Sequence, residues 1–510
     1  MLNKLSNPEH KTKMLNLLYC RQFILGPHFV DVAPGWRHIE IDPNLKLSIH
    51  PEVDVEQTAH ANRKLVAIGF MLDSVTPEKT TREILSELIN KADNIDALTK
   101  ATGPYGGRWI LIASFGDKKY LFNDPTGLRQ VFFTDPAITG ALWMVAQPGL
   151  AEKFLNLQFD EEAIKYTDSH SFRVRDEFGW PSSSTAFRGL THLMPNHILD
   201  LNAGLSHRFW PCAPIGTMST EDAEAFITAR LTNILRAAAI RYPLAIGMTA
   251  GIDSRIVMAL AKDISSEIDF VTVRQRKMPD DHPDITIPAE LCNKYGLNHV
   301  VIKAKTTMSA DFSKLFKDNV FMATDIYGPD AEAIINRLQR KKAVITGSSG
   351  EIGRCPFLEL FPASKYNGPI EAAEIAEAVN YKDEPFVIRH YQAWLDGAVN
   401  RYDIQLLDLF NWEQSHGNWV PMTQMQFDIA WREIITPYNC RDVLQAFLSV
   451  NQRDRIEPAL LLQKNIISRS WPELLEQPIN PHQVTKLGAI AKIKRFIKNR
   501  IKFFRRLSGR

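Results

Sequence analysis

The stretch LAIGMTAGIDSRIVMALAK, residues 244–262, decides the fold of the larger part of the chain. It begins with a short apolar run, continues through a loop of small and hydroxyl residues, and ends in apolar residues at helical spacing. We expect a strand over residues 244–248 and a helix over residues 254–262. A loop between such a strand and helix presents backbone N–H groups at the positive helix end, where anions such as phosphate bind.

The same alternation continues on both sides of this stretch. A capping-box spacing at residues 219–222 opens a helix, and β-branched strands are expected at 268–273, 299–302 and 343–346, with a helix at 287–295. This order predicts an α/β domain over residues 215–485, built on a parallel sheet with helices on both faces. Beyond about residue 360 the helical period dominates, which predicts a helical C-terminal part.

The first 210 residues have a different character. Short apolar runs at 108–114, 119–123 and 130–134 are separated by turn residues, and one amphipathic helix is expected at 81–91. This pattern predicts an α+β domain of antiparallel sheets over residues 1–210.

Composition narrows the class of protein. Of 510 residues, 45% are hydrophobic and 23% charged, and the five cysteines contain no CxxC pair, so a zinc knuckle or a disulfide framework is not indicated. No apolar run approaches a membrane span, and we expect a cytoplasmic protein. Residues 486–510 carry ten Lys or Arg and no acidic residue. The rest has 50 basic and 58 acidic residues, a net charge of −8, which disfavours nucleic-acid binding.

The loop after the first strand has the groups that a nucleotide site needs. Thr249 and Ser254 can donate hydroxyl hydrogen bonds to phosphate, and Asp253 can hold a magnesium ion. The alternative is an ordinary strand-to-helix turn in which Asp253 or Ser254 caps the helix.

Several motifs together resemble the asparagine synthetase family, whose members cleave ATP to AMP and pyrophosphate. Residues 248–254, MTAGIDS, resemble its Leu-Ser-Gly-Gly-x-Asp-Ser loop, and residues 346–351, TGSSGE, resemble its second glycine-rich loop. Residues 107–109 and 123–129 resemble strands of the family's N-terminal-nucleophile glutaminase domain, and 437–442 its Pro-Phe-Leu-Asp segment. The resemblance covers roughly residues 20–480. It implies a glutaminase-like sandwich followed by an ATP-pyrophosphatase domain.

The resemblance also implies roles for individual residues, with ATP and Mg²⁺ as cofactors. Pyrophosphate would lie against Thr249, Gly251, Ile252 and Ser254, adenosine against Met248, Thr272, Thr346 and Gly347, and Mg²⁺ would bind Asp253 and Glu351, the latter being alternatively the catalytic base.

The sequence departs from the family pattern in both domains. Leu2 stands where the glutaminase has its Cys nucleophile, so we expect no glutaminase activity, and Cys20 is interpreted as a buried structural thiol. Glu351 is the one carboxylate left of three in the second loop, and no Lys occurs around residues 477–481. Arg354 is the candidate catalytic cation in its place, or else a surface salt-bridge residue.

Three further features remain open. Arg255 at the helix start could reach a phosphate. His282 and Asp284 could meet the substrate or form a solvated turn. The segment NWEQSHGNW, residues 411–419, places Glu413, His416 and Trp419 in a polar and aromatic cluster that is either a substrate wall or a helix junction.

The tail has apolar residues at three- and four-residue steps between its basic ones, as in an amphipathic helix. It would dock on the anionic inner face of the membrane or on an acidic partner, unless it is a solvated tail. For the body we expect an ATP-dependent ligase that activates a small-molecule or peptide carboxylate as an acyl-adenylate for attack by ammonia or an amine. The alternative is a catalytically degenerate member that binds nucleotide or a partner.

Overall fold

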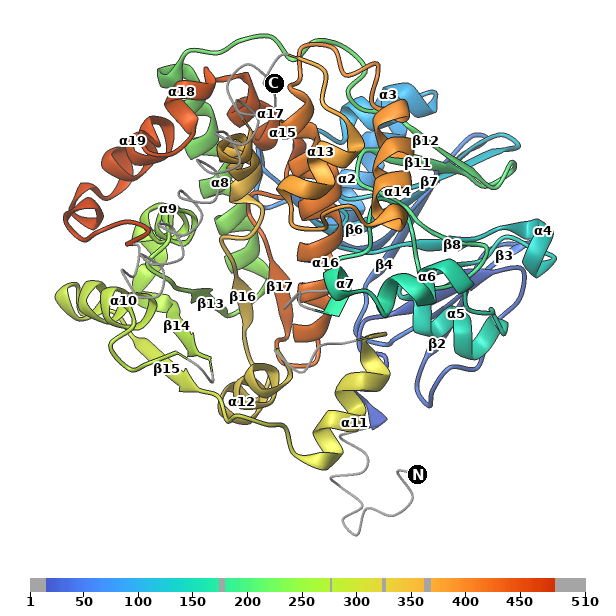
Figure 1. The fold of residues 1–510 in the computed structure, drawn as a ribbon, viewed down its shortest axis with the longest axis horizontal. Coiled ribbons are helices and arrows are strands. Elements are labelled where there is room, and N and C mark those ends of the chain that lie inside the picture. The colour runs from blue at the N-terminus through green and yellow to red at the C-terminus, as the bar shows by residue number, and fades with distance from the viewer. Residues whose placement is uncertain (1–14, 174–178, 276–277, 323–326, 362–367, 482–510) are drawn as a thin grey trace, which may run out of the picture.

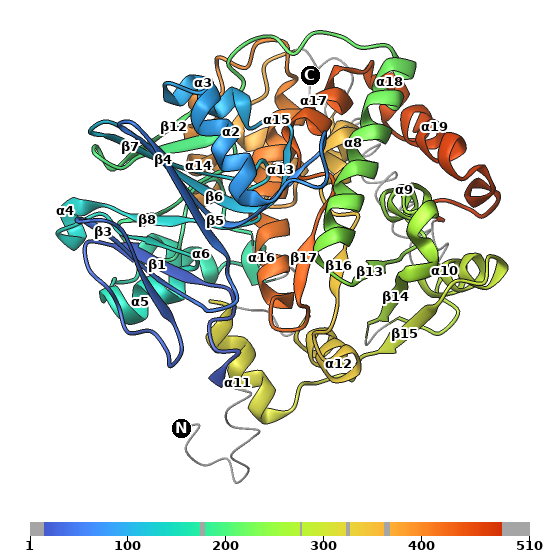
Figure 2. The same cartoon turned by 180° about the vertical axis from the view of Figure 1, so that it is seen from behind.

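The computed structural model describes residues 15–173, 179–275, 278–322, 327–361 and 368–481 (Figure 1). They form two six-stranded sheets and one five-stranded sheet. In Figures 1 and 2 the blue and teal strands gather on one side of the molecule, and the strands of the five-stranded sheet lie on the other. The molecule is therefore an α/β structure in two parts, with antiparallel sheets in one part and a parallel sheet in the other.

Two antiparallel sheets make up the first part of the chain. Their strand orders are β10-β8-β9-β1-β3-β2 and β12-β11-β7-β6-β5-β4. The first contains β1 (Phe23–Gly26), β2 (Arg37–Asp42), β3 (Leu45–Ile49), β8 (Phe132–Thr134), β9 (Met144–Val145) and β10 (Leu190–His192). The second contains β4 (Val55–His60), β5 (Arg63–Asp73), β6 (Tyr105–Phe115), β7 (Lys118–Asn123), β11 (His197–Asp200) and β12 (Leu205–Arg208). The antiparallel architecture predicted from the turn-rich sequence is confirmed.

The second sheet is buried on both faces because successive side chains along a strand point to opposite sides. Val66 and Ile68 of β5 pack in the core between the sheets, whereas Leu65 and Ala67 pack in a separate core beneath α2 and α3. The predicted helix α2 (Thr81–Lys91) starts at a capping box. The other helices of this part are α3 (Ile95–Ala101), α4 (Pro136–Thr139), α5 (Pro148–Leu155), α6 (Glu161–Thr167) and α7 (His170–Arg173).

A parallel five-stranded sheet organises the second part, in the order β15-β14-β13-β16-β17. Its strands are β13 (Leu244–Gly247), β14 (Asp269–Arg274), β15 (His299–Lys303), β16 (Ala343–Ile345) and β17 (Glu433–Ile435). The chain runs outward from β13 to β15 and then returns to the other side of β13 as β16. The loops after β13 and β16 thus leave one sheet edge where the strand order reverses, the place where open α/β sheets bind ligands.

Helices cover both faces of this sheet, as predicted. Leu244 and Ile246 of β13 pack in the core that includes α8 and α9, whereas Ala245 packs against α11 and α12. These helices are α8 (Thr220–Arg241), α9 (Ile252–Leu260), followed by the short η2 (Lys262–Glu267), α10 (Pro283–Lys294), α11 (Ala310–Asn319) and α12 (Gly328–Leu338).

Two helix boundaries differ from the prediction. The helix expected at 254–262 starts at Ile252, and the helix expected at 287–295 starts at Pro283. Proline suits the first helical position because its φ is already helical and its missing N–H costs nothing there. Strand β17, which lies in a region with helical spacing, was not predicted.

The C-terminal part is mainly helical. It contains η3 (Gly350–Arg354), η4 (Pro356–Leu360), α13 (Ala372–Ala378), α14 (Pro385–Gly397), α15 (Leu406–Phe410), α16 (Gly417–Phe427), α17 (Arg441–Ser449), α18 (Gln452–Arg455), α19 (Leu461–Ser470) and η7 (Pro472–Glu476). A π-helical segment, Asn411–His416, joins α15 to α16 in one continuous helix. Such a segment adds a residue to a turn and shifts which side chains face each side.

Buried charges join the two parts. Arg108 of β6 donates both terminal nitrogens to Asp428, at 2.5 and 2.9 Å. Arg21 lies 3.3 Å from the same carboxylate, and Glu433 of β17 lies within 4.0 Å of Arg21, Arg108 and Arg129. Each of these side chains is at most 6% exposed, so the parts are connected by a dry ionic network.

No helix in the described ranges combines the length and apolar character needed to cross a membrane. Leu2 and the predicted amphipathic tail at residues 486–510 lie outside the described residues.

Candidate functional site

A cavity of about 530 Å³ lies at the edge of the parallel sheet where the loops after β13 and β16 meet. Residues predicted for an ATP site supply much of its lining, namely Met248, Thr249, Gly251, Asp253, Ser254, Thr272, Thr346, Gly347 and Glu351. The fold thus brings together two segments about a hundred residues apart in the sequence. The volume is within the usual range for small-molecule sites.

The side chain of Ile252 does not take part. It is fully buried in the core beside α8 and α9. Its backbone N–H donates to Asn480 Oδ1 at 3.2 Å. Any contact that Ile252 makes with a phosphate must therefore come from its backbone.

The first loop satisfies many of its own polar groups. Thr249 and Ser254 hydroxyls lie 3.0 Å apart, and the Gly251 N–H donates to Thr249 Oγ1 at 3.1 Å. The Ala250 N–H donates to Asp284 Oδ1 at 2.8 Å. Together with Asn480, Asp284 supplies oxygen acceptors to the loop amides. An incoming phosphate would have to replace these acceptors.

Glycines let the two loops approach each other closely. A Cβ added to Gly347 would lie 2.8 Å from the Ser254 nitrogen, and one added to Gly350 would lie 2.6 Å from Asp253 Oδ1. Both separations are shorter than real Cβ contacts. The second loop therefore needs glycine at these two positions to rest against the start of α9.

Arg354 forms an ion bridge across the site. Its Nη2 lies 2.9 Å from Asp253 Oδ2 and 2.8 Å from Glu351 Oε1. Burial raises the pKa of Asp253, and the Arg354 charge opposes that rise. Arg354 is therefore not an exposed salt-bridge residue, since its side chain is 13% exposed and it holds both carboxylates predicted to bind metal.

The donor set of this bridge fits a magnesium ion. Mg²⁺ in nucleotide sites is held by one or two carboxylates together with phosphate oxygens and water. Arg354 engages Oδ2 of Asp253 and Oε1 of Glu351, which leaves the other oxygen of each carboxylate for a metal. Asp253 and Glu351 are thus able to hold Mg²⁺ beside a fixed guanidinium charge.

Three lining residues carry buried polar atoms that no described residue satisfies. They are both ring nitrogens of His416, Nε1 of Trp419 and Oγ of Ser349. Burial, with the Arg354 charge, lowers the pKa of His416 to about 3, so its ring is neutral. Ser349 has a left-handed backbone with φ of 67°, a strained conformation for serine. Buried polar atoms without protein partners are usually satisfied by a bound water, an ion or a ligand group.

The neighbours that the sequence grouped with these residues have structural roles. Glu413 is fully buried and accepts hydrogen bonds from Arg208 at 2.5 Å and Trp394 at 2.8 Å. His282 caps α10, because its Nδ1 accepts the Asp284 N–H at 3.1 Å. The expected polar and aromatic cluster is therefore divided, with His416 and Trp419 at the cavity and Glu413 in the helix packing.

Arg255, for which the sequence left a phosphate contact open, turns into the protein. Its guanidinium is buried and donates to the carbonyl oxygens of Leu474 at 3.2 Å, Gln477 at 2.7 Å and Pro478 at 2.9 Å. Burial lowers its pKa to about 10. Arg255 fastens the segment after α19 to the first loop.

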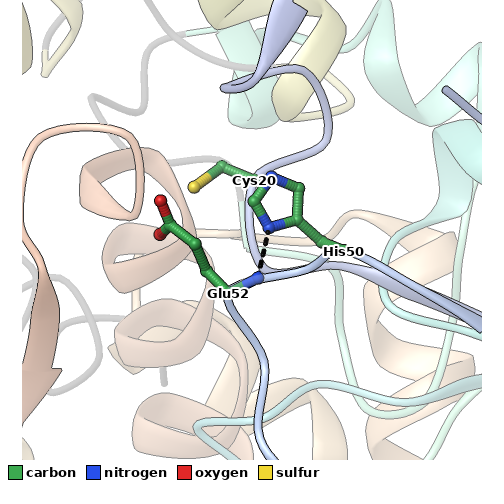
Figure 3. Close-up of side chains that lie close together, drawn as sticks. All are labelled: Cys20, His50 and Glu52. Atoms are coloured by element: carbon green, nitrogen blue, oxygen red, sulfur yellow. Dashed lines mark hydrogen bonds between the residues drawn. The ribbon is translucent and has the colours of Figure 1, made fainter. Parts of the chain in front are cut away.

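A second group of metal-binding residue types lies at the junction of the two parts (Figure 3). One ligand atom each from Cys20, His50 and Glu52 lies within 4.8 Å of the others. Both ring nitrogens of His50 are engaged, one with the Asn16 oxygen at 2.9 Å and one by the Glu52 N–H at 3.2 Å. Arg340 contacts the Cys20 sulfur at 3.4 Å and pairs with Glu52 at 2.5 Å.

This second group fits an ordinary buried junction better than a metal or catalytic site. Neither ring nitrogen of His50 is left for a metal, because one faces the Asn16 oxygen and the other accepts the Glu52 N–H. Burial raises the pKa of Cys20 to about 11, so the thiol is neither a good ligand nor a nucleophile. Cys20 is completely buried, as the sequence interpretation holds.

Comparisons with known proteins give only remote similarity. No protein-family model matches the chain, and no curated protein matches it. The allosteric regulatory enzyme of purine biosynthesis is 11% identical over 78% of this chain and 90% of its own, with a TM-score of 0.26. Glutamine phosphoribosylpyrophosphate amidotransferase from B. subtilis is 11% identical over 78% and 91%, with a TM-score of 0.24. NH3-dependent NAD synthetase from Campylobacter jejuni is 15% identical over 34% and 77%, with a TM-score of 0.19. Similarity this weak carries no argument about function.

Proposed function

We propose that the chain is an ATP-dependent ligase that joins a carboxylate to ammonia or an amine. The observation that carries this proposal is the cavity at the reversal point of the parallel sheet, where both resembling loops supply its lining. A resemblance in two separate motifs gains weight when the fold brings the motifs into one cavity. In this proposal the parallel sheet is an ATP-pyrophosphatase domain, and the antiparallel pair is a glutaminase-like scaffold.

The proposed reaction has two steps. A carboxylate oxygen of the substrate attacks the α-phosphorus of ATP, the bond to the β-phosphate oxygen breaks, and pyrophosphate leaves. The amine nitrogen then attacks the acyl carbon, AMP leaves, and the amine gives up a proton. The nitrogen would come from free ammonia or an amine, because Leu2 stands where the resemblance expects the Cys nucleophile of the glutaminase.

The described residues supply recognisable parts of this chemistry. Thr249, Ser254 and the start of α9 would contact the pyrophosphate, while Mg²⁺ bound by Asp253 and Glu351 would neutralise its charge. Arg354 would stabilise negative charge that grows on the leaving oxygens, since a fixed guanidinium in a buried site needs no reorganisation. Alternatively, Glu351, 38% exposed and 3.8 Å from His416, would accept the amine proton instead of binding the metal.

A second candidate function rests on the same contacts. The loop amides are occupied by Asp284 and Asn480, and both carboxylates are occupied by Arg354. A site whose loop amides and carboxylates already have partners would also suit a protein that binds nucleotide or a partner without turning it over. The two candidates differ in one property, the release of pyrophosphate.

Isothermal calorimetry with MgATP tests the binding step. Asp253→Asn should weaken ATP binding by about 1.5 to 3 kcal/mol, the scale of a hydrogen bond to a charged group. Asp263→Asn is the matched control, because Asp263 lies just past the other end of α9 and is 82% exposed. Equal ATP affinity in both variants would exclude Asp253 from the site.

Pyrophosphate exchange into ATP, measured with a panel of carboxylic acids, tests the chemistry. Exchange that depends on an added acid supports the ligase. ATP binding without exchange for any acid would favour the second candidate.

A further inference from the structure

A second cavity, of about 500 Å³, lies mainly in the helical C-terminal part. It adjoins the cavity between the loops after β13 and β16, which in the proposed function is the nucleotide cavity. Aromatic rings form much of its wall, contributed by Trp180, Phe357, Tyr381, Tyr391, Phe410 and Trp419. Several of these rings pack edge to face, with Tyr391 and Phe410 at 5.3 Å between centroids. The rings therefore support one another, and we name this volume the aromatic cavity.

None of the described residues that line the aromatic cavity carries a charge. Its polar lining comes from neutral groups, Asn380, Gln414, Ser415 and Asn418. A charged ligand group would lose its hydration there without an ionic partner, which is costly. An uncharged and largely apolar group would fit these walls, and an aromatic ring gains most from them.

A buried donor in the wall, on Gln414, has no partner among the described residues. Gln414 is 6% exposed, and its Oε1 accepts the Ser182 N–H at 2.6 Å. That hydrogen bond fixes the amide, and its Nε2 is left buried without a partner among the described residues. A buried donor left unmet is costly, so a ligand that brings an acceptor would gain from the contact.

The π-helical segment connects this cavity to the nucleotide site. Within three consecutive residues, Gln414 and Ser415 line the aromatic cavity and His416 lines the nucleotide cavity. Trp419, one turn later, lines both. Buried contacts of Glu413 hold the segment in place. A ligand that spans both volumes would pass along the indole of Trp419.

We propose that the aromatic cavity binds the uncharged, ring-bearing body of the carboxylate substrate, whose carboxyl group reaches the nucleotide cavity. The inference rests on the proposed function only for the reaction of that carboxyl group. It predicts an aryl or heteroaryl carboxylic acid as the substrate class. A dicarboxylic amino acid such as aspartate has no place for its second charge in such walls.

Filling the cavity tests the assignment. Ala378 lines the cavity at the end of α13, whereas Ala373 on the same helix is exposed, so Ala378→Phe and Ala373→Phe are matched. Binding of 3-phenylpropionate, indole-3-acetate and aspartate is measured by calorimetry on the full chain without nucleotide. We expect the unmodified chain to bind the aromatic acids more tightly than aspartate. Ala378→Phe should weaken binding of the aromatic acids at least tenfold, and Ala373→Phe should leave their affinity within twofold of the unmodified chain.

A second variant does not depend on adding bulk. Gln414→Glu keeps an acceptor for the Ser182 N–H and replaces the free donor by a carboxylate oxygen. This substitution should weaken binding of both aromatic acids at least fivefold. Equal affinities of the aromatic acids for the unmodified chain, Ala378→Phe and Gln414→Glu would overturn the assignment, as would a preference of the unmodified chain for aspartate.

ATP binding, measured separately in the same variants, tells the two proposals apart. If aromatic acids bind in a way that depends on Ala378 and Gln414 but the chain does not bind ATP, the assignment of the aromatic cavity stands and the ligase proposal is refuted. If aspartate is the one acid that supports pyrophosphate exchange into ATP, the ligase proposal stands and the aromatic substrate is refuted.

Discussion

Asp428→Asn is the change that most directly tests how the two parts of the chain are joined. Asp428 accepts two hydrogen bonds from Arg108 and lies 3.3 Å from Arg21, with 3% of its side chain exposed. The substitution keeps the shape and removes the charge. Both guanidinium groups then stay buried beside Glu433, and Arg21 also keeps Glu52 at 3.5 Å, so the cost comes mainly from cations that have lost one carboxylate partner.

Breaking a buried ion pair on one side typically costs about 3 to 5 kcal/mol. We expect a loss of unfolding free energy on this scale. Burial alone would raise the pKa of Asp428, but Arg108, Arg21 and Arg129 hold it below its ordinary value. A lowered folded pKa contributes stability above the unfolded pKa of about 3.9 and loses it as the pH falls through the folded value. The variant should therefore lose part of its acid sensitivity.

Urea unfolding at pH 7 and at about pH 2.5, below the unfolded pKa of about 3.9, measures both effects by tryptophan fluorescence and circular dichroism. Asp168→Asn is the control, because Asp168 is 68% exposed and pairs with the exposed Arg173, so its loss should cost less than about 1 kcal/mol. If Asp428→Asn costs no more than Asp168→Asn, the network does not hold the parts together and the reasoning fails.

Three further outcomes are expected. Iodoacetamide should label Cys212, the one exposed cysteine of the five, well before Cys20; rapid labelling of Cys20, read by mass spectrometry, would contradict its burial. Arg255→Met should lower the free energy of unfolding, measured with urea, by about 1 to 3 kcal/mol, because buried carbonyl oxygens lose a donor. Weaker ATP binding at unchanged stability would instead indicate a phosphate contact. Removing residues 486–510 should leave the melting temperature unchanged and abolish salt-sensitive binding to anionic vesicles, since each basic residue there contributes about 1 kcal/mol; a fall of several degrees would show that the tail packs on the body.

The sequence predicted the sheets well, because side-chain periodicity follows directly from burial. The stretch at 244–262 alternates between two covered faces, and its strand, loop and helix appear within two residues of their expected places. Strand β17 was missed, since a run as short as Glu433–Ile435 is set by pairing with β16 rather than by its own pattern. Short strands of this kind depend on tertiary context.

The candidate site was predicted unevenly, and the reason is again physical. Motif spacing identified Thr249, Asp253 and Glu351, because a loop at a sheet edge places neighbouring residues in one cavity. The direction of a side chain is not written in such spacing. Arg255 and Arg354 are both cations near the loop, yet one turns into the protein and the other bridges the site. The groups that surround each guanidinium, carbonyl oxygens for Arg255 and carboxylates for Arg354, set its direction, and residue type does not reveal them.

In the proposed nucleotide site, the existing pairing of the polar groups bears on how strongly ATP would bind. A phosphate that enters must replace the Asp284 contact to the Ala250 N–H and the Asn480 contact to the Ile252 N–H. Each amide therefore contributes to the binding free energy only the difference between its hydrogen bond to phosphate and the one it loses. Arg354 likewise offers a charge that Asp253 and Glu351 already neutralise. Mg²⁺ shifts this balance, because a cation held by the two carboxylates releases part of the Arg354 charge for the phosphates. ATP affinity should therefore depend steeply on Mg²⁺, while adenosine, which lacks phosphates, should bind equally with or without the metal.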